Sequence, residues 1–330
     1  MQKKKKICKL KIGEKQMAKV SRRKFLTITA SSLALALPFD KLKAESKEEI
    51  SKTSWKGIAL GAKSNMTLFH KDKDYAKKSL DACILEIKRL ESIFSLFNKN
   101  SSISKLNKFG VLKNPPKELV DVLNFAHTIS INTKGAFDVT VQPLWLAHEK
   151  AFKDKGNTRN LKKYIKKASK LVSYKNIIIT QEEIRFKIKD MKITLNGIAQ
   201  GYITDSITNI LRQKGFKNVL VDLGEFNSIG GHKDNRDWNI STPYLNDIDY
   251  LKLNNNAMAS SGGYGTRFSK EYHHLFDVKT GTSANYIKAV TVKAGNAMLA
   301  DALATAFFVT PENKRNKIQK IYPNIELYIS

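Results

Sequence analysis

Hydrophobic residues recur at helical spacing in two long segments of the chain. Residues 74–97 and residues 117–130 each place apolar side chains three or four positions apart, which collects them on one face of a helix. Residues 200–214 continue the same pattern and stop at Gly215, a residue type that commonly ends a helix. Residues 296–309 are apolar at nearly every position and precede a proline. The pattern predicts a helix in each of these segments.

Short runs rich in β-branched residues alternate with turn-forming residues in the second half of the chain. Residues 150–170 are rich in lysine and weakly apolar, which indicates an exposed insertion or a surface helix. Because strands and helices do not alternate strictly, we expect an α+β fold rather than a doubly wound parallel sheet. The β-strands are predicted at residues 176–180, 184–188, 191–195, 218–223, 238–242 and 287–293.

The composition is that of a globular protein with a strongly basic surface. The chain has 330 residues, of which 42% are hydrophobic and 27% are charged, enough for a packed core in one large domain or two. Lys and Arg outnumber Asp and Glu by 58 to 30, so anionic partners such as phosphorylated cofactors or acidic lipids are favoured. Aromatic residues do not alternate with the lysines and no nucleic-acid-binding motif is present, so nucleic acid is not an expected partner.

The first 44 residues have the features of an export signal. Arg22 and Arg23 come shortly before the apolar stretch 27–37, and a small residue follows at the expected cleavage point. This pattern predicts a twin-arginine signal peptide at residues 1–44 and an exported domain at residues 45–330. The alternative is an amphipathic anchor that stays attached. The expected location is therefore periplasmic or otherwise extracytoplasmic, with contact to the membrane surface if the segment is retained.

Asp301 and Thr305 are the only polar residues of the predicted apolar helix after Asn296. Four positions apart, they share one helix face. A buried carboxylate needs hydrogen bonds or a cation, and oxygen ligands suit a hard ion such as Mg²⁺. The alternative is that Asp301 caps backbone amides and Thr305 bonds back to the preceding turn. The helix taken alone favours this alternative.

Three other segments contain residues suited to chemistry, and each has a simpler structural interpretation. Gly197 and Gly201 stand between a predicted strand and a helix, an arrangement that lets the backbone approach an anion or merely forms a turn. Asp138 interrupts an apolar run and either needs a partner or marks a turn. His273 and His274 could transfer protons near neutral pH, although adjacent histidines on a strand point to opposite faces. Alternatively, the histidines are surface residues.

Taken together and in this order, these segments resemble the ApbE family of FAD:protein FMN transferases over roughly residues 55–310. Residues 97–107 and 258–262 resemble two further family motifs, and residues 297–305 match the family's metal-binding helix almost letter for letter. The resemblance implies a single catalytic domain with an α+β, T-fold-like arrangement of mixed sheets and packed helices. It also implies Mg²⁺ dependence, FAD as substrate, and transfer of FMN to a Ser or Thr hydroxyl of an acceptor flavoprotein, with release of AMP.

The resemblance also assigns roles to individual positions of this chain. Asp301 and Thr305 would be side-chain ligands of the metal, and Gly197 would add its carbonyl oxygen. His274 would be the family's catalytic motif histidine. The acceptor hydroxyl needs a base, and either His274 or a neighbouring carboxylate could serve. The expected acceptor is an exported electron-transfer subunit. Binding of FAD would involve Leu60, Ala136, Phe137, Asp138, Thr194, Gln200 and Leu275.

The chain departs from the family pattern near the expected site. Thr194 and Gly263 stand where the family usually has aspartate, and Gln200 stands where it usually has lysine or glutamate. Glu225 follows Gly224 in place of the usual Gly-Gly-Asp or Gly-Gly-Asn, and its carboxylate could replace one lost charge. Two other functions therefore stay open: a Mg²⁺-dependent FAD pyrophosphatase that uses the same site, and a flavin-binding protein without catalysis.

Overall fold

The structure of the protein is a computed structural model. Its compact unit is Glu48–Ser330. The predicted export signal at residues 1–44 lies outside the described residues. The structure describes residues 49–153, 158–242, 244–245 and 248–330.

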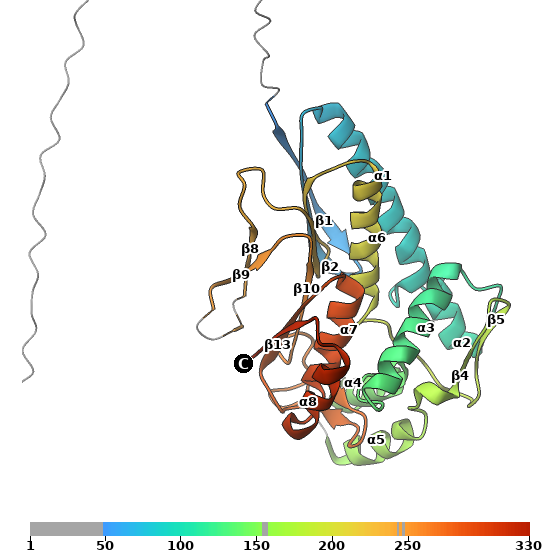
Figure 1. Cartoon of the computed structure of the whole chain (residues 1–330). Helices are drawn as coiled ribbons and strands as arrows, with labels where there is room; N and C mark the ends of the chain where they lie inside the picture. Colours follow the sequence, from blue (N-terminus) through green and yellow to red (C-terminus); the bar gives the residue numbers. More distant parts are fainter. Residues whose placement is uncertain (1–48, 154–157, 243, 246–247) are drawn as a thin grey trace, which may run out of the picture. The chain divides into compact units, whose positions relative to one another are not determined.

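A seven-stranded antiparallel sheet forms the centre of this unit (Figure 1). The first and last strands of the chain form its two edges. The edge strand at the N-terminal end alternates between half-buried and exposed residues, whereas the strand beside it is mostly buried, as expected for an inner strand with a covered face. In spatial order the strands are β1 (Ser51–Ala59), β2 (Ala62–His70), β6 (Asn218–Asp222), β7 (Phe226–Ile229), β10 (Ala257–Gly262), β13 (Ala289–Ala294) and β14 (Glu326–Ile329).

Three helices cover one face of the sheet (Figure 1): α1 (Lys73–Phe94), α6 (Ala199–Gln213) and α7 (Ala297–Phe308). α7 packs on β10 and β13 and lies against α6. Most of its residues are buried, because it lies between the sheet and neighbouring helices and therefore needs apolar side chains on most sides.

The opposite face of the sheet has its own smaller core. Phe69 and Met258 belong to this core, whereas their neighbours Leu68 and Ala259 belong to the main one, because successive side chains of a strand point to opposite faces. The hairpin of β8 (Trp238–Ser241) and β9 (Tyr250–Leu253) supplies most of the remaining apolar side chains of this core.

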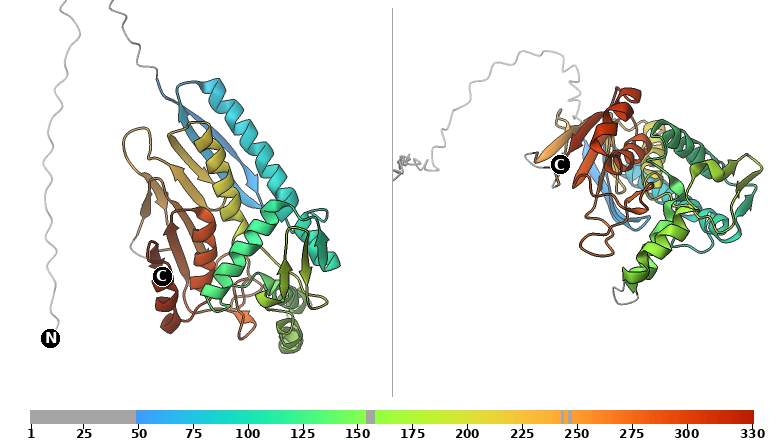
Figure 2. Two further views of the ribbon diagram at one scale, coloured as in Figure 1. Left: turned by 45° about the vertical axis from the view of Figure 1, so that its right-hand side comes forward. Right: turned by 90° about the horizontal axis from the view of Figure 1, so that it is seen from below.

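A second group of elements packs beside the helical face, and it is drawn in green tones in Figures 1 and 2. It contains four helices and a small antiparallel sheet: α2 (Ser102–Phe109), α3 (Lys117–Asn132), α4 (Gln142–Lys153), α5 (Leu161–Ser169), β3 (Val111–Lys113), β5 (Glu183–Phe186) and β4 (Ile177–Ile179). The remaining elements are β11 (Phe276–Asp277), β12 (Thr282–Ser283), α8 (Glu312–Ile321) and 3₁₀ turns at Val139–Val141, Thr158–Asn160 and Tyr174–Asn176.

The predicted helices are confirmed as α1, α3, α6 and α7, with ends shifted by up to three residues. Five of the six predicted strands are confirmed as β4, β5, β6, β8 and β13. The lysine-rich segment 150–170 contains the end of α4 and all of α5, and the α5 lysines are exposed. No helix in the described part of the chain is long and apolar enough to cross a bilayer.

The predicted strand at residues 191–195 is wrong, since the structure shows no strand there. The backbone of Ile193 pairs with a side chain instead. Its N–H donates to Asn107 Oδ1 at 2.7 Å, and Asn107 Nδ2 donates to its carbonyl at 2.8 Å. The next N–H, of Thr194, donates to the Val139 carbonyl at 2.8 Å. One asparagine thus replaces a partner strand, which an apolar run in the sequence does not reveal.

Candidate active site

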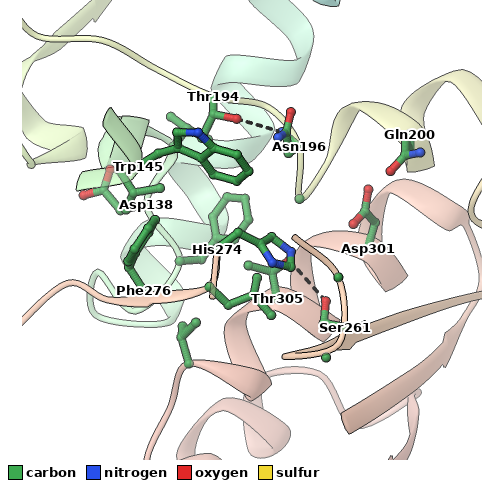
Figure 3. A pocket seen from close by; sticks show the side chains of 18 of the residues that line it. Asp138, Trp145, Thr194, Asn196, Gln200, Ser261, His274, Phe276, Asp301 and Thr305 are labelled. Carbon is green, nitrogen blue, oxygen red and sulfur yellow. Dashed lines mark hydrogen bonds between the residues drawn. The ribbon is translucent and has the colours of Figure 1, made fainter. Parts of the chain in front are cut away.

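A cavity of about 240 Å³ lies where α6, α7 and the ends of several loops meet. Its lining includes almost every residue that the sequence assigned to the site: Ala136, Phe137, Asp138, Thr194, Gly197, Gln200, His274, Leu275, Asp301 and Thr305. Figure 3 shows Trp145 and Asp138 on one side of the cavity, Asp301 on the other, and His274 between them. Segments far apart in the sequence therefore converge on one place.

Asp301 is 4% exposed and lies in the middle of α7. It does not cap its own helix, because Asn296 Oδ1 accepts the Leu299 N–H there at 2.8 Å. Asp301 Oδ2 instead accepts the N–H of Gly201 at 3.1 Å, one of the unpaired amides in the first turn of α6. No described residue donates to Asp301 Oδ1, and Asp301 is one of the residues that line the cavity. The capping alternative therefore accounts for one oxygen of this carboxylate and leaves the other free.

Thr305 and Gly197 bring further candidate oxygen ligands to the cavity that Asp301 lines. The Thr305 hydroxyl oxygen lies 3.4 Å from Ser261 Oγ and has no bond to its own helix among the described residues. A Cβ at Gly197 would lie 2.6 Å from Thr305 Oγ1, so only glycine lets this backbone approach the hydroxyl so closely. A carboxylate, a hydroxyl and a nearby backbone carbonyl are ligands that suit Mg²⁺. Among the described residues, no group of three or more His, Cys, Asp or Glu side chains is arranged to hold a metal ion.

Glu225 adds another buried carboxylate to the cavity. It is 8% exposed and accepts the backbone N–H of Ser260. Burial raises the pKa of Glu225 well above its ordinary value, and the nearby Asp301 carboxylate raises it further. Burial also raises the pKa of Asp301 to about 8, although the Gly201 N–H opposes this shift. At neutral pH the Glu225 and Asp301 carboxylates are therefore stable side by side only when they hold protons or a cation. The sequence indicated that Glu225 could replace one of the carboxylates lost at Thr194 and Gly263. In the structure Glu225 lies close enough to Asp301 for the two carboxylates to interact.

His274 lies in the cavity wall as a neutral base. Its Nδ1 is 3.1 Å from the Thr266 carbonyl, and because a carbonyl only accepts, Nδ1 carries the proton and Nε2 is free to accept one. Burial lowers the pKa of His274 to about 4. A Cβ at Gly265 would lie 2.6 Å from its ring. His273 lines a different cavity, so at most one histidine of the pair faces this site, as expected, although the two residues do not lie on a strand.

The Asp138 carboxylate is occupied by local hydrogen bonds. Oδ1 accepts the Thr140 N–H at 2.8 Å and the Thr140 hydroxyl at 2.6 Å, and Oδ2 accepts the Tyr174 N–H at 2.9 Å. Burial nevertheless raises the pKa of Asp138. The structural interpretation of Asp138 as a turn-forming residue is therefore correct, and it shapes the cavity wall at the same time.

The sequence did not predict two residues that line the cavity, and one predicted site residue lies outside the cavity lining. Trp145 and Phe276 line the cavity, and their only signal in the sequence was their position beside predicted site motifs. Leu60 is not among the cavity-lining residues. It lies in the turn between β1 and β2 with a φ of 47°, and its N–H donates to Glu91 Oε1 at 2.7 Å. A role for Leu60 in binding FAD stays a prediction.

These features define a class of protein: an α+β domain whose cavity offers oxygen ligands for a hard cation beside a neutral histidine. Residues 60–329 match the ApbE family model, and the chain belongs to the ApbE family.

Curated relatives agree with this assignment. The FAD:protein FMN transferase of Haemophilus influenzae is 27% identical over 264 residues, which cover 74% of this chain and 75% of the relative. The FAD:protein FMN transferase of Escherichia coli K12 is 23% identical over 283 residues, which cover 81% of this chain and 78% of the relative.

Solved structures confirm the α+β, ApbE-like fold. The ApbE protein of Thermotoga maritima matches with a TM-score of 0.72 at 28% identity, covering 84% of this chain and 94% of that one. The flavin transferase ApbE of Vibrio cholerae matches with a TM-score of 0.72 at 21% identity, covering 85% of this chain and 94% of that one.

Proposed function

We propose that this protein is a Mg²⁺-dependent FAD:protein FMN transferase. It would move the FMN half of FAD to a Ser or Thr hydroxyl of an acceptor flavoprotein and release AMP. One observation supports this proposal above all. In a chain of the ApbE family, Asp301, Thr305 and Gly197 converge on the cavity that also holds the free Nε2 of His274.

The donor set fits Mg²⁺, which would be held by Asp301 Oδ1, Thr305 Oγ1 and the Gly197 carbonyl. When bound, the ion neutralises charge on the pyrophosphate and on the departing AMP. The chain itself contributes rigidity to these ligands. Asp301 is fixed by the Gly201 N–H, and it belongs to a helix buried on most sides. Ligands held in this way lose little freedom when the ion and its substrate bind.

His274 would take the proton of the acceptor hydroxyl. The acceptor oxygen forms a bond to the phosphorus of the FMN half, the bond from that phosphorus to the bridging oxygen breaks, and AMP leaves with the bridging oxygen. The hydroxyl proton moves to Nε2, while the Thr266 carbonyl holds the proton on Nδ1 and fixes the ring. An anionic pyrophosphate beside the ring would raise its pKa from about 4 towards a value useful for a general base.

The wall formed by Phe137, Trp145 and Phe276 is apolar and suits an aromatic ring of FAD. Thr194 and Gln200 offer hydrogen bonds at its rim. With threonine at position 194, the buried carboxylates of Asp301 and Glu225 would compensate the charge of the ion.

Covalent transfer is tested by incubating the purified protein with FAD, MgCl₂ and an acceptor flavoprotein. We expect flavin fluorescence on the denatured acceptor band, together with one AMP for each flavin transferred. Fluorescence that disappears on replacing the acceptor Ser or Thr by alanine confirms the hydroxyl as the attachment point. AMP and free FMN without labelled acceptor would instead indicate a pyrophosphatase, and FAD binding without AMP would indicate a flavin-binding protein.

We further propose that residues 1–44 direct export by the twin-arginine route and that the acceptor is an exported electron-transfer subunit. The pair Arg22 and Arg23 before a short apolar stretch supports this proposal. Contact with the membrane surface follows if the segment is retained.

A further inference from the structure

A second cavity of about 760 Å³ adjoins the first. Tyr264 lines both cavities. Residues 265–274, which follow Tyr264, form the wall between the two cavities. Gly265 and His274 line the first cavity, whereas Arg267 and His273 line the second. The wall of the proposed catalytic site is therefore also the wall of a neighbouring site to which no role has been assigned.

This wall is fixed by hydrogen bonds of its own side chains. Arg267 Nη1 donates to the Gly263 carbonyl at 2.7 Å, and its Nη2 donates to the Lys270 carbonyl. His273 Nδ1 accepts the Leu275 N–H at 3.2 Å, so its Nε2 carries the proton and donates to Asn285 Oδ1 at 3.2 Å. The Arg267 and His273 side chains thus hold the wall and leave ligand recognition to other residues of the cavity.

The segment from Asn285 to Ala289 lines the second cavity. The N–H groups of Lys288 and Ala289 donate to the Ser330 carbonyl. No described residue accepts the N–H groups of residues 285–287. Backbone donors without a protein acceptor, on residues that line a cavity, are suited to hydrogen bonding with the backbone of an extended polypeptide.

The side chains of the second cavity favour a polypeptide as well. Tyr244 stacks on Tyr264 with ring centroids 3.6 Å apart and an interplanar angle of 9°, and Tyr286 is 43% exposed. Exposed tyrosines are typical of protein-binding surfaces. Lys288 is exposed, it has no ion pair among the described residues, and no Asp or Glu side chain lines this cavity. An acidic side chain of a ligand would therefore be attracted to Lys288.

We propose that the second cavity binds the segment of the acceptor protein that flanks its Ser or Thr hydroxyl, with an acidic side chain of that segment at Lys288. This inference rests on the proposed FMN transfer. A hydroxyl that reaches His274 belongs to a chain whose flanking residues need space outside the first cavity. The second cavity provides that space directly behind the His273–His274 wall.

Kinetics with the full enzyme, FAD, MgCl₂ and the acceptor protein test the proposal. We expect Lys288→Glu to raise the KM for the acceptor about tenfold, as loss of one favourable charge contact would. The kcat at saturating acceptor and the FAD dissociation constant, measured by flavin fluorescence, should stay unchanged. Lys252→Glu is the matched control, since Lys252 is an exposed lysine on β9, and it should leave all three values unchanged.

An unchanged acceptor KM in Lys288→Glu would overturn the proposal. So would a parallel loss of FAD affinity in Lys288→Glu and Tyr244→Ala, because the second cavity would then hold the adenosine half of FAD.

A binding measurement separates this proposal from the proposed function. A photo-cross-linking residue at position 288 should attach to the acceptor within the segment around its Ser or Thr, whereas the same residue at position 252 should not. Flavin transfer without this cross-link would refute the docking site and leave the transferase function intact. The cross-link without flavin transfer would support docking and refute the transferase function.

Discussion

At the scale of single residues, the site depends on a carboxylate placed where water is scarce. Asp301 is almost fully buried, and only one of its oxygens has a hydrogen-bond donor. An ionised carboxylate in this position is costly unless a cation compensates it. The buried carboxylate with one unpaired oxygen therefore favours binding of a divalent ion at Asp301 over a purely structural role for this residue.

Replacing Asp301 by asparagine removes the charge and keeps an acceptor for the Gly201 N–H. We expect Asp301→Asn to lower AMP release at least 100-fold, because the ion loses its principal ligand. The melting temperature should stay within a few degrees of the wild-type value. AMP is quantified by chromatography, and Mg²⁺ binding by calorimetry. Asp234→Asn, at an exposed carboxylate, is the control, and equal turnover in both variants would disprove the metal assignment.

The pKa of Asp301 also predicts how stability changes with pH when no metal is bound. Burial raises this pKa from 3.8 to about 8. Between these values the folded protein holds a proton that the unfolded chain releases, so the free energy of unfolding falls as pH rises through about 8. In EDTA, urea unfolding should show a larger loss of stability from pH 5 to pH 8 for wild type than for Asp301→Asn. Parallel curves would show that Asp301 does not titrate in this range.

His274 supplies a different kind of test, because its pKa is lowered to about 4. The base form predominates above this value in the free enzyme, and the bound pyrophosphate raises the pKa, so the wild-type transfer rate should fall towards pH 5 as His274 takes up a proton. His274→Ala should slow transfer about 100-fold and leave Mg²⁺ and FAD binding unchanged. Single-turnover rates across this pH range provide the measurement. A variant that transfers flavin at the wild-type rate would place the base elsewhere.

At the scale of elements, α6 and α7 are locked together by reciprocal bonds. Asp205 on α6 accepts the Ala297 N–H at 2.7 Å and the Met298 N–H at 2.9 Å, at the start of α7. Asp301 on α7 accepts the Gly201 N–H at the start of α6. Gly201 allows this close approach, since a Cβ there would lie 2.4 Å from the Ala297 carbonyl oxygen. The proposed metal ligand is therefore positioned by the packing of two helices.

Removal of the Asp205 carboxylate should loosen this pair. Asp205→Ala leaves two helix amides and the Asn227 side chain without their acceptor, so we expect a loss of about 2–4 kcal/mol in the free energy of unfolding. Urea denaturation measures the loss, with Asp74→Ala on the exposed start of α1 as the control. A loss below about 0.5 kcal/mol in Asp205→Ala would show that the helices hold together without these bonds.

The helices and the site residues differ in how well the sequence predicts them. The apolar spacing of α1, α3, α6 and α7 was sufficient to predict them, because each buries a face or more in the core. The segment 191–195 alternates apolar and polar residues as a strand does, but its backbone is fixed by the Asn107 side chain. Asp301 and Thr305 stood out because they interrupt an apolar helix. Asp205 did not, since its partners are 92 and 93 residues away in the sequence.

At the scale of the whole molecule, the export prediction links the enzyme to its acceptor. Replacing both Arg22 and Arg23 by lysine should retain the protein in the cytoplasm, since the pair defines the twin-arginine signal. Cell fractionation with immunoblotting gives the distribution, and a variant with Lys5 and Lys6 replaced by glutamine is the control. Normal export of the double-lysine variant would refute this route.

The most direct measurement is anomalous diffraction from crystals soaked with FAD and Mn²⁺ in place of Mg²⁺. We expect a manganese peak in contact with Asp301 Oδ1, Thr305 Oγ1 and the Gly197 carbonyl, beside the phosphates of the bound dinucleotide. An ordered FAD in the cavity with no metal peak there, and Asp301 bound only to the Gly201 N–H, would contradict the proposed role of this carboxylate.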